Sequence, residues 1–253
     1  MYWSAKLLEL RELSPGYHLL RVELLGVVPR EPEPLQFVML WVPRVDEMPM
    51  SVADYENGVL TIVFRVRGEG TRALSRGPPF LGVRGFYGRG LVPRRGERVL
   101  FVAGGIGIAP FPYLARVAER AGARVGLAWG VRRGSELFDV SSVAPFSSVD
   151  EVEVATEDCS RGFCGNAVDL ALSMYSRGGW DRVIAVGPNA MLAAVCEKLG
   201  SRALVAPEVM TKCGVGVCGS CTLKPHPLLL CVHGALLSCG DIRGFLVGSD
   251  ARG

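Results

Sequence analysis

The first third of the chain alternates short apolar stretches with polar breaks. HLLRVELLG, QFVMLWVP and VLTIVFRVRG are rich in β-branched and aromatic residues, and Pro, Gly and acidic residues separate them. Short runs of this composition are typical of β-strands, and several of them in succession indicate a small barrel. The pattern therefore predicts an all-β barrel over residues 1–95.

From residue 96 the pattern changes to apolar strands that alternate with amphipathic helices. The predicted strands are ERVLFVAGG, ARVGLAWG, VDEVEVATED and DRVIAVGPN, and the predicted helices are FPYLARVAERAGA, AVDLALSMYSRGG and AMLAAVCEKLG. Buried strands with helical crossovers form a parallel sheet. We predict a doubly wound α/β domain over residues 96–205. Residues 206–253 are rich in Cys and Gly and too few to form a core without help, so they are predicted to be a third part.

Composition excludes several classes of protein. A net charge of +3 on 253 residues is too small to indicate nucleic-acid binding. No apolar run reaches the length of about 18 residues that spans a membrane, and the N-terminus lacks the pattern of a signal peptide. We expect a cytoplasmic protein, in which the eight cysteines are metal ligands or free thiols rather than a disulfide framework.

Glycines follow the first strand of the α/β part. In VAGGIGIAP, residues Gly104, Gly105 and Gly107 stand between a strand and a helix, where bare backbone can approach a diphosphate. Two further strand ends carry polar or turn residues, and they are Thr156, Glu157 and Asp158 in ATED and Gly187 and Pro188 in VGPN. Ligands of such sheets bind at these ends. The alternatives are an ordinary tight turn and, for ATED, a helix cap or polar loop.

The barrel holds a second cluster of candidate residues. Gly70 and Thr71 end the stretch VFRVRGEGT and can offer N–H and hydroxyl donors to a phosphate, with Arg65 or Arg72 as charge partner. MPMS (Met48–Ser51) opens a loop or strand, and GFYGRG (Gly85–Gly90) forms a turn. The simpler interpretation is that these are hairpin turns.

Four cysteines are spaced as ligands of a [2Fe–2S] cluster. Cys213, Cys218, Cys221 and Cys231 form the pattern C-x4-C-x2-C with a remote fourth cysteine, which is the plant-type spacing. The rival is a structural zinc site, but such sites favour paired short knuckles. The other four cysteines fall outside this pattern. We expect Cys196 to fill the core, Cys159 and Cys164 to be unpaired thiols rather than a pair or nucleotide contacts, and Cys239 to be spare.

Taken in order, these parts resemble the ferredoxin reductase superfamily. Within it the chain is similar to the iron–sulfur flavoprotein subunits of type 1B, NAD-dependent dihydroorotate dehydrogenases. GEGT, GFYGRG, GGIGIAP, TED, VGPNAM and above all EVMTKCGVGVCGSC with CVHG carry the resemblance. It implies a ferredoxin-reductase-like FAD barrel, a doubly wound NAD domain and a C-terminal [2Fe–2S] module held by the four cysteines.

The resemblance also implies roles for individual residues. Those placed at FAD are Met48, Pro49, Met50, Ser51, Val63, Phe64, Arg65, Gly70 and Thr71. Those placed at the nicotinamide nucleotide are Gly104, Gly105, Gly107, Thr156, Glu157, Asp158, Gly187 and Pro188. Met48 departs from the family, which usually has an arginine there to neutralise the FAD diphosphate, so another cation or more N–H donors must replace it.

The implied function is electron transfer with a partner. An FMN-containing dihydroorotate dehydrogenase catalytic subunit would supply electrons through the [2Fe–2S] cluster and FAD to NAD⁺ in pyrimidine biosynthesis, in a heterotetramer of two plus two subunits. No catalytic acid or base is expected in this chain. Two alternatives stay open, and they are a diaphorase subunit of a hydrogenase, sulfur reductase or glutamate-synthase-like complex, and a zinc-stabilised interaction domain. Arg132 and Arg133 follow the second α/β strand, where NADP enzymes read a 2′-phosphate, but they can equally be surface arginines, so NAD and NADP both stay open.

Overall fold

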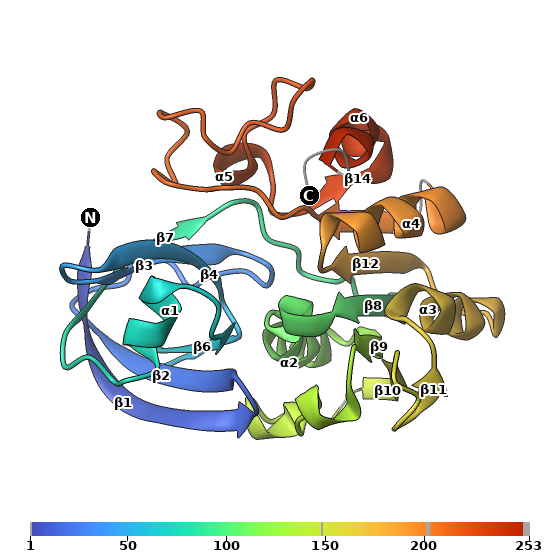
Figure 1. Ribbon diagram of the computed structural model, residues 1–253, viewed down its shortest axis with the longest axis horizontal. Coiled ribbons are helices and arrows are strands. Elements are labelled where there is room, and N and C mark those ends of the chain that lie inside the picture. The colour runs from blue at the N-terminus through green and yellow to red at the C-terminus, as the bar shows by residue number, and fades with distance from the viewer. Residues whose placement is uncertain (1, 148, 201–202, 250–253) are drawn as a thin grey trace.

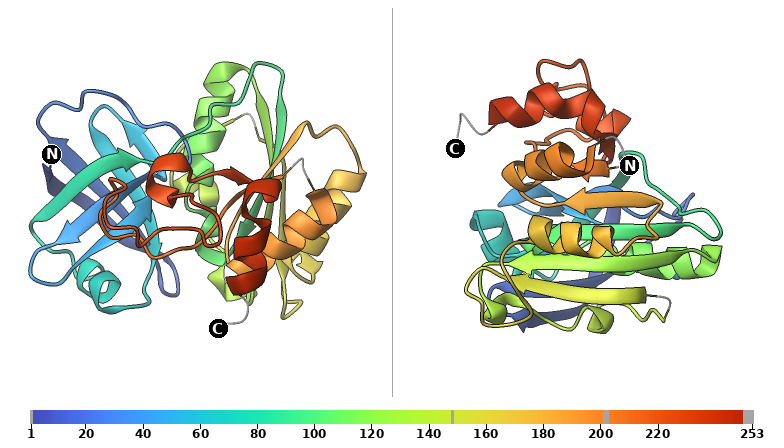
Figure 2. Two further views of the ribbon diagram at one scale, coloured as in Figure 1. Left: turned by 90° about the horizontal axis from the view of Figure 1, so that it is seen from above. Right: turned by 90° about the vertical axis from the view of Figure 1, so that its right-hand side faces the viewer.

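Two seven-stranded sheets stand side by side, and a cysteine-rich segment lies over both of them (Figures 1 and 2). The computed structural model describes residues 2–147, 149–200 and 203–249. Residues 1 and 250–253, at the outer ends of the first and third predicted parts, lie outside the described residues. No helix in the described ranges is long and apolar enough to cross a membrane.

The first sheet is antiparallel and curls around its own core. Its order is β4-β3-β7-β1-β2-β6-β5, so β4 and β5 are the two edges of an open barrel. The strands are β1 (Trp3–Ser14), β2 (Tyr17–Leu25), β3 (Phe37–Val42), β4 (Asp46–Ser51), β5 (Asp54–Glu56), β6 (Val59–Arg65) and β7 (Leu81–Tyr87). The three predicted strands are confirmed as β2, β3 and β6. Leu74 of α1 (Glu69–Leu74) is fully buried and closes one side of this core.

The second sheet is parallel, with one antiparallel strand added at its edge. Its order is β11-β10-β9-β8-β12-β13-β14, and only β14 runs antiparallel to its neighbour. The strands are β8 (Arg98–Gly104), β9 (Arg124–Val131), β10 (Val149–Thr156), β11 (Phe163–Cys164), β12 (Arg182–Val186), β13 (Ala203–Ala206) and β14 (Leu237–Ser238). Strand order reverses beside β8, the first strand of this sheet, which confirms the predicted doubly wound arrangement.

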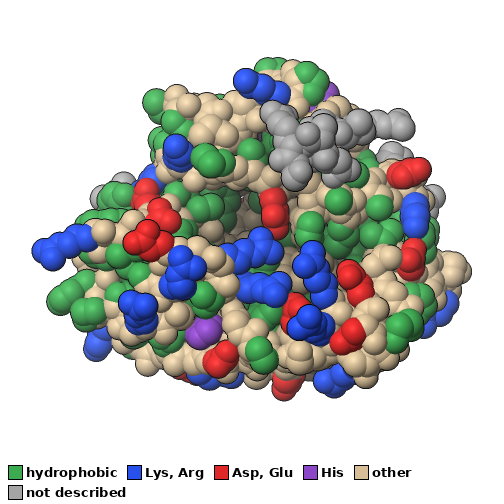
Figure 3. Space-filling view, viewed as in Figure 1, with side chains coloured by type: hydrophobic (Ala, Val, Ile, Leu, Met, Phe, Trp, Pro, Cys, Tyr) green, Lys and Arg blue, Asp and Glu red, His purple; other side chains and the backbone are tan. Residues whose placement is uncertain are grey.

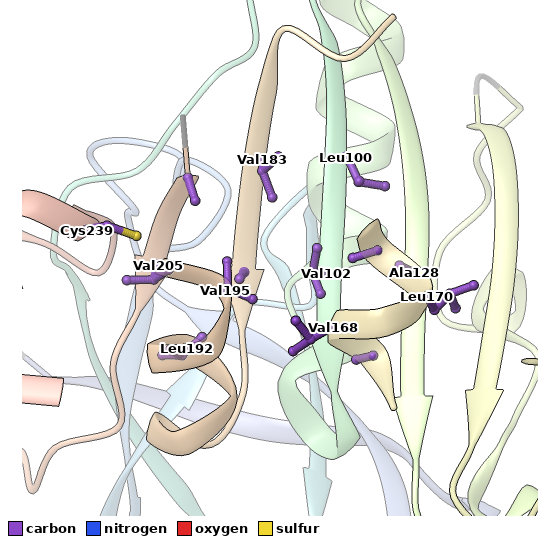
Figure 4. Packing of buried hydrophobic residues seen from close by; sticks show 14 of the residues in the cluster. Leu100, Val102, Ala128, Val168, Leu170, Val183, Leu192, Val195, Val205 and Cys239 are labelled. Atoms are coloured by element: carbon purple, nitrogen blue, oxygen red, sulfur yellow. The ribbon is translucent and has the colours of Figure 1, made fainter. Parts of the chain in front are cut away.

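Alternate residues of the strands face helices on opposite sides of this sheet. Leu100 and Val102 pack against α3 (Ala167–Ser176) and α4 (Asn189–Leu199), as Figure 4 shows. Val99 and Phe101 pack on the other side against α2 (Phe111–Ala121). Both faces are therefore covered, which explains the almost continuous apolar runs of these strands. Short 3₁₀ turns are η1 (Gly105–Ile108), η2 (Gly134–Glu136) and η3 (Val140–Ser142).

The cysteine-rich segment borrows its core from both sheets. Cys221 and Cys231 pack with Leu230 against Phe37 and Met39 of β3. Farther along, β14 pairs with β13, and α6 (Cys239–Ser249) packs against α4. A short helix, α5 (Leu230–His233), carries the last of the four spaced cysteines. A segment too small to bury a core alone is thus held by contacts with the barrel and the α/β sheet.

Candidate functional site

A first cavity of about 460 Å³ opens between the barrel and the cysteine-rich segment. Its barrel wall includes predicted FAD residues from β4 and β6, together with Thr71 of α1. These residues are Met48, Pro49, Met50, Ser51, Val63, Phe64, Arg65 and Thr71. Gly107 and Gly187 line the side toward the α/β sheet, and Val209, Thr211 and Leu230 line the side toward the cysteines. The cavity is therefore mostly apolar, with a few polar groups at its edge.

Gly70 lies behind this wall rather than in it. A Cβ at Gly70 would collide with the Met48 sulfur, so glycine is needed there for close packing of α1 on β4. The Thr71 hydroxyl donates to the Gly68 carbonyl (3.1 Å) and accepts from the N–H groups of Arg67 (2.9 Å) and Gly68 (3.0 Å). This threonine closes the turn at the start of α1. Arg72, predicted as a charge partner, lines neither cavity.

A second cavity of about 450 Å³ lies at the carboxyl ends of the parallel strands. Gly104, Gly105, Glu157 and Pro188 are the predicted nucleotide residues that line it. Thr156 and Asp158 do not. Thr156 is fully buried, and its hydroxyl donates to the Arg161 carbonyl at 2.9 Å. The Asp158 carboxylate accepts from the Ser160 hydroxyl, a hydrogen bond that lowers the pKa of Asp158. Both side chains shape the loop after β10.

Two arginines of the barrel line both cavities. Arg65 is held in place, because it pairs with Glu136 (3.5 Å) and lies 5.1 Å from the centre of the Tyr17 ring. Tyr17 donates to the same carboxylate at 3.1 Å, and burial raises the pKa of this tyrosine to about 12. Arg67, which the sequence had not singled out, makes no ion pair with any described residue. Lys and Arg side chains gather beside the hollow at the centre of this face (Figure 3).

Other cavity-lining residues also escaped the sequence analysis. In the second cavity these include Asn166, Asp169, Lys198 and Glu208. Lys198 pairs with Asp169 at 3.1 Å, and the Asn166 side chain caps α3 through the N–H groups of residues 168 and 169. Asn166 stands just before a predicted helix, Asp169 and Lys198 lie within predicted helices, and Glu208 begins the stretch EVMTKC, so no shared pattern pointed to a cavity. Arg132, singled out as a candidate reader of a 2′-phosphate, lines this cavity too, whereas Arg133 does not.

The four spaced cysteines form two pairs. The outer pair is Cys213 and Cys218, and the N–H of Cys218 donates to the Cys213 sulfur at 3.4 Å. That N–H, with those of Val215 and Val217, lowers the pKa of Cys213 to about 6. The Ser220 hydroxyl likewise lowers the pKa of Cys218. These hydrogen bonds favour the thiolate form of the outer cysteines, which is the form that binds iron.

The inner pair is Cys221 and Cys231, whose sulfur atoms lie 3.3 Å apart in the core. Burial raises the pKa of Cys231 to about 11. No three Cys, His, Asp or Glu side chains in the described ranges meet where one metal ion could be held. Two pairs of thiols suit a centre with two irons, each of which needs two thiolates. Gly214, Gly216 and Gly219 have φ of +73°, +78° and +71°, the left-handed turns that let the loop wrap around its sulfurs.

The remaining four cysteines are paired, so the expectation of free thiols was wrong. Cys159 bonds to Cys164 across the loop after β10, and Cys196 of α4 bonds to Cys239 at the start of α6. The Cα atoms of the second pair lie 5.3 Å apart. Sequence could not bring Cys196 and Cys239 together, because their 43-residue separation hides the packing of α6 on α4.

Opening the Cys196–Cys239 disulfide should destabilise the protein. The bond closes a loop of 43 residues that contains all four spaced cysteines, and such a loop is worth roughly 2–4 kcal/mol of stability. We expect Cys239→Ser to lower the free energy of unfolding by that amount in a urea titration. Cys164→Ser opens a separation of only five residues and should cost less. Equal midpoints for wild type and Cys239→Ser under oxidising conditions would count against a stabilising disulfide.

No family model matches the chain, but named relatives do. A protein of Caldanaerobacter subterraneus subsp. tengcongensis, named dihydroorotate dehydrogenase B (NAD⁺), electron transfer subunit, is 33% identical over 233 residues, or 88% of this chain and 90% of that protein. One from Pyrococcus furiosus, whose name adds "probable", is 37% identical over 206 residues, or 81% and 79% of the two chains. The chain belongs to the family of dihydroorotate dehydrogenase B electron-transfer subunits.

Solved structures confirm the fold of this dihydroorotate dehydrogenase electron-transfer family member. An NADH-dependent reduced ferredoxin–NADP oxidoreductase that carries out flavin-based electron bifurcation superposes with a TM-score of 0.79 at 22% identity, covering 96% of this chain and 93% of the other. A ferredoxin–NADP⁺ reductase of Neisseria gonorrhoeae with bound FAD and NADP gives 0.64 at 14% identity, covering 82% and 98%. The predicted ferredoxin-reductase-like architecture of barrel and α/β sheet is therefore confirmed.

Proposed function

We propose that this chain is the electron-transfer subunit of an NAD-dependent dihydroorotate dehydrogenase. It would act with an FMN-containing catalytic subunit that oxidises dihydroorotate, and would deliver the electrons to NAD⁺ in pyrimidine biosynthesis. The names of its relatives point to this reaction. We further propose FAD in the first cavity, the nicotinamide nucleotide in the second, a [2Fe–2S] cluster on the four spaced cysteines, and a heterotetramer of two plus two subunits.

The observation that carries the proposal is that the three binding places adjoin one another. Val209 and Thr211 line the first cavity just before Cys213, and Leu230 lines it beside Cys231. Arg65, Arg67, Ile106 and Glu208 line both cavities. A flavin exchanges a hydride with a nicotinamide and single electrons with an iron–sulfur cluster. In this proposal the nicotinamide nucleotide, FAD and the cluster lie in that order along one continuous path, and the fold of the chain determines the order.

The chain's side chains suit these groups. Pro49, Val63 and Phe64 offer an apolar wall for a flat ring, and the Ser51 hydroxyl is the polar group on that wall. In the second cavity, the glycines after β8 expose backbone to a diphosphate. A Cβ at Gly104 would lie 2.6 Å from the Met191 sulfur and 3.0 Å from the Pro188 ring, so a larger residue there would force the Met191 side chain to move. We propose that the Glu157 carboxylate, which lines this cavity, accepts hydrogen bonds from a ribose.

Arg67 is the side chain best placed to supply the charge that Met48 cannot. It lines the first cavity close in sequence to Thr71, and no described carboxylate neutralises it. A charge-assisted hydrogen bond to a phosphate is worth about 1.5–3 kcal/mol. We therefore expect Arg67→Gln to weaken FAD binding about tenfold or more, measured as flavin lost during ultrafiltration at known protein concentrations. Arg72→Gln, on α1 but outside both cavities, is the matched control and should retain FAD. Equal retention by both variants would rule out this role.

The proposed function is tested by co-expression with a candidate FMN-containing catalytic subunit from the same organism. We expect a complex that reduces NAD⁺ when dihydroorotate is added, and a purified chain with one FAD and two irons per protomer, in keeping with one cluster of this type. A colourless chain that contains zinc would overturn the proposal in favour of an interaction domain. A coloured chain that associates instead with a nickel or molybdenum enzyme would indicate a diaphorase.

A further inference from the structure

Arg84, on strand β7 of the barrel, is the centre of a polar cluster beneath the cysteine-rich segment. Its guanidinium makes a two-pronged ion pair with Glu47 of β4, with Nε–Oε1 at 2.6 Å and Nη2–Oε2 at 2.7 Å. Tyr2 donates to the same carboxylate at 2.7 Å. The Arg84 side chain is only 13% exposed and that of Glu47 23%. The guanidinium and the carboxylate are therefore largely shielded from water, which helps to fix the geometry of the ion pair.

The remaining donors of Arg84 reach into the cysteine loop. Nη2 donates to the carbonyl of Lys212 at 3.0 Å, and Nη1 donates to the carbonyl of Cys213 and to the Tyr87 hydroxyl (3.2 Å). One side chain thus holds the backbone of the first cysteine of the motif. Lysine could not reproduce this arrangement, because a guanidinium presents five donors in a rigid plane and an ammonium presents three at one point.

The end of the same strand holds the last cysteine. The N–H of Gly88 donates to the Cys231 carbonyl at 3.1 Å. A Cβ at Gly88 would lie 2.9 Å from the N atom of Ala235, and one at Gly214 would lie 2.7 Å from the Tyr87 ring. Strand β7 and the residue after it therefore contact both ends of the cysteine motif closely.

The loop has few other connections of this kind. Apart from the Arg84 bonds, the side-chain hydrogen bonds found for residues 212–219 in the described part of the chain run to neighbours within the cysteine-rich segment. Val215 and Val217 of the loop are exposed. A segment with so few buried contacts depends strongly on each anchor.

We propose that Arg84 is a positioning residue that fixes the cysteine loop to the flavin barrel and, with Glu47, sets the charge beside the cluster. The proposal rests on the proposed function, because it assigns the loop to a [2Fe–2S] centre. Arg84 and Glu47 together are close to neutral, so removal of either one leaves an uncompensated charge of opposite sign. A reduced cluster carries one more negative charge than an oxidised one, so the two removals should shift its potential in opposite directions.

The test uses the full chain and three variants of the pair. Arg84→Met should speed hydrogen exchange of the amides of residues 211–219 about tenfold or more, because two charge-assisted hydrogen bonds are lost. The cluster potential, followed by its EPR signal during reductive titration, should fall in Arg84→Met and rise in Glu47→Gln. Arg84→Lys keeps the positive charge but loses the planar set of guanidinium donors. In this variant the amides of residues 211–219 should exchange faster than in the wild type, while the cluster potential stays near the wild-type value.

Arg116→Met is the matched control. Arg116 is likewise a buried arginine paired with carboxylates, Asp54 and Glu56, but it joins α2 to β5 rather than to the cysteine loop. It should lower thermal stability and change neither loop exchange nor potential. Wild-type exchange in Arg84→Met, or potentials that move in the same direction in Arg84→Met and Glu47→Gln, would overturn the proposal. If Arg84→Met does not fold, unchanged loop exchange in Arg84→Lys overturns it.

The two proposals fail in different ways. A wild-type chain without iron would refute the [2Fe–2S] assignment, while the exchange measurement would still decide whether Arg84 anchors the loop.

Discussion

Replacement of Cys218 by serine is expected to abolish dihydroorotate-dependent NAD⁺ reduction by the complex while NADH oxidation with an artificial dye stays largely intact. Cys218 is an exposed member of the outer pair, and its pKa is lowered by the Ser220 hydroxyl and N–H. A serine hydroxyl does not ionise in this range and is a poor iron ligand. The path from the partner should therefore be interrupted at the cysteine loop, whereas the two cavities proposed to hold FAD and the nicotinamide nucleotide are untouched.

The measurement combines both activities with iron analysis of the purified complex. Cys239→Ser is the matched control. It removes a cysteine from the same segment, but this cysteine is bonded to Cys196 and is not one of the four spaced cysteines. At 25 °C it should keep its iron and both activities. Partner-linked activity retained by Cys218→Ser would refute the role of this loop in electron transfer.

Gly107→Ala should distort the junction of the two cavities, because Gly107 lines the first cavity while the adjoining Gly105 and Pro188 line the second. A Cβ at Gly107 would collide with the Val186 carbonyl oxygen and lie 2.6 Å from its carbon and 3.0 Å from the Gly187 N atom. All three are backbone atoms at the end of β12, which pairs with β8 and cannot move aside alone. Overpacking of this kind costs about 1–3 kcal/mol. We expect a lower melting temperature and a higher KM for NADH in the dye assay.

Gly240→Ala provides the comparison. Gly240 lies in α6, where the nearest atom to an added Cβ is the Ser238 hydroxyl oxygen at 3.7 Å, an ordinary contact. Alanine there should leave the KM unchanged and should not destabilise the helix. If Gly107→Ala matched Gly240→Ala in both measurements, close approach of η1 to β12 would not be needed for nucleotide binding.

Much of the architecture could be read from local patterns. Each strand and helix predicted for the α/β part was found, because alternation of apolar strands with amphipathic helices is a property of neighbouring residues. Met48–Ser51 and Val63–Arg65 do line one cavity, yet Gly70, Thr156 and Asp158 turned out to support loops. A motif places a residue near a site, but it does not say which way the side chain points.

The sequence by itself determined the succession of barrel, doubly wound sheet and cysteine segment, and the spacing of Cys213, Cys218, Cys221 and Cys231. Those features depend on residues close together in the chain. Only the tertiary structure joined Cys196 to Cys239, placed Arg67 at both cavities, and set Arg84 under the carbonyl of Cys213. Each of these contacts links elements far apart in sequence, and it is the packing of the two sheets and the segment above them that brings such residues together.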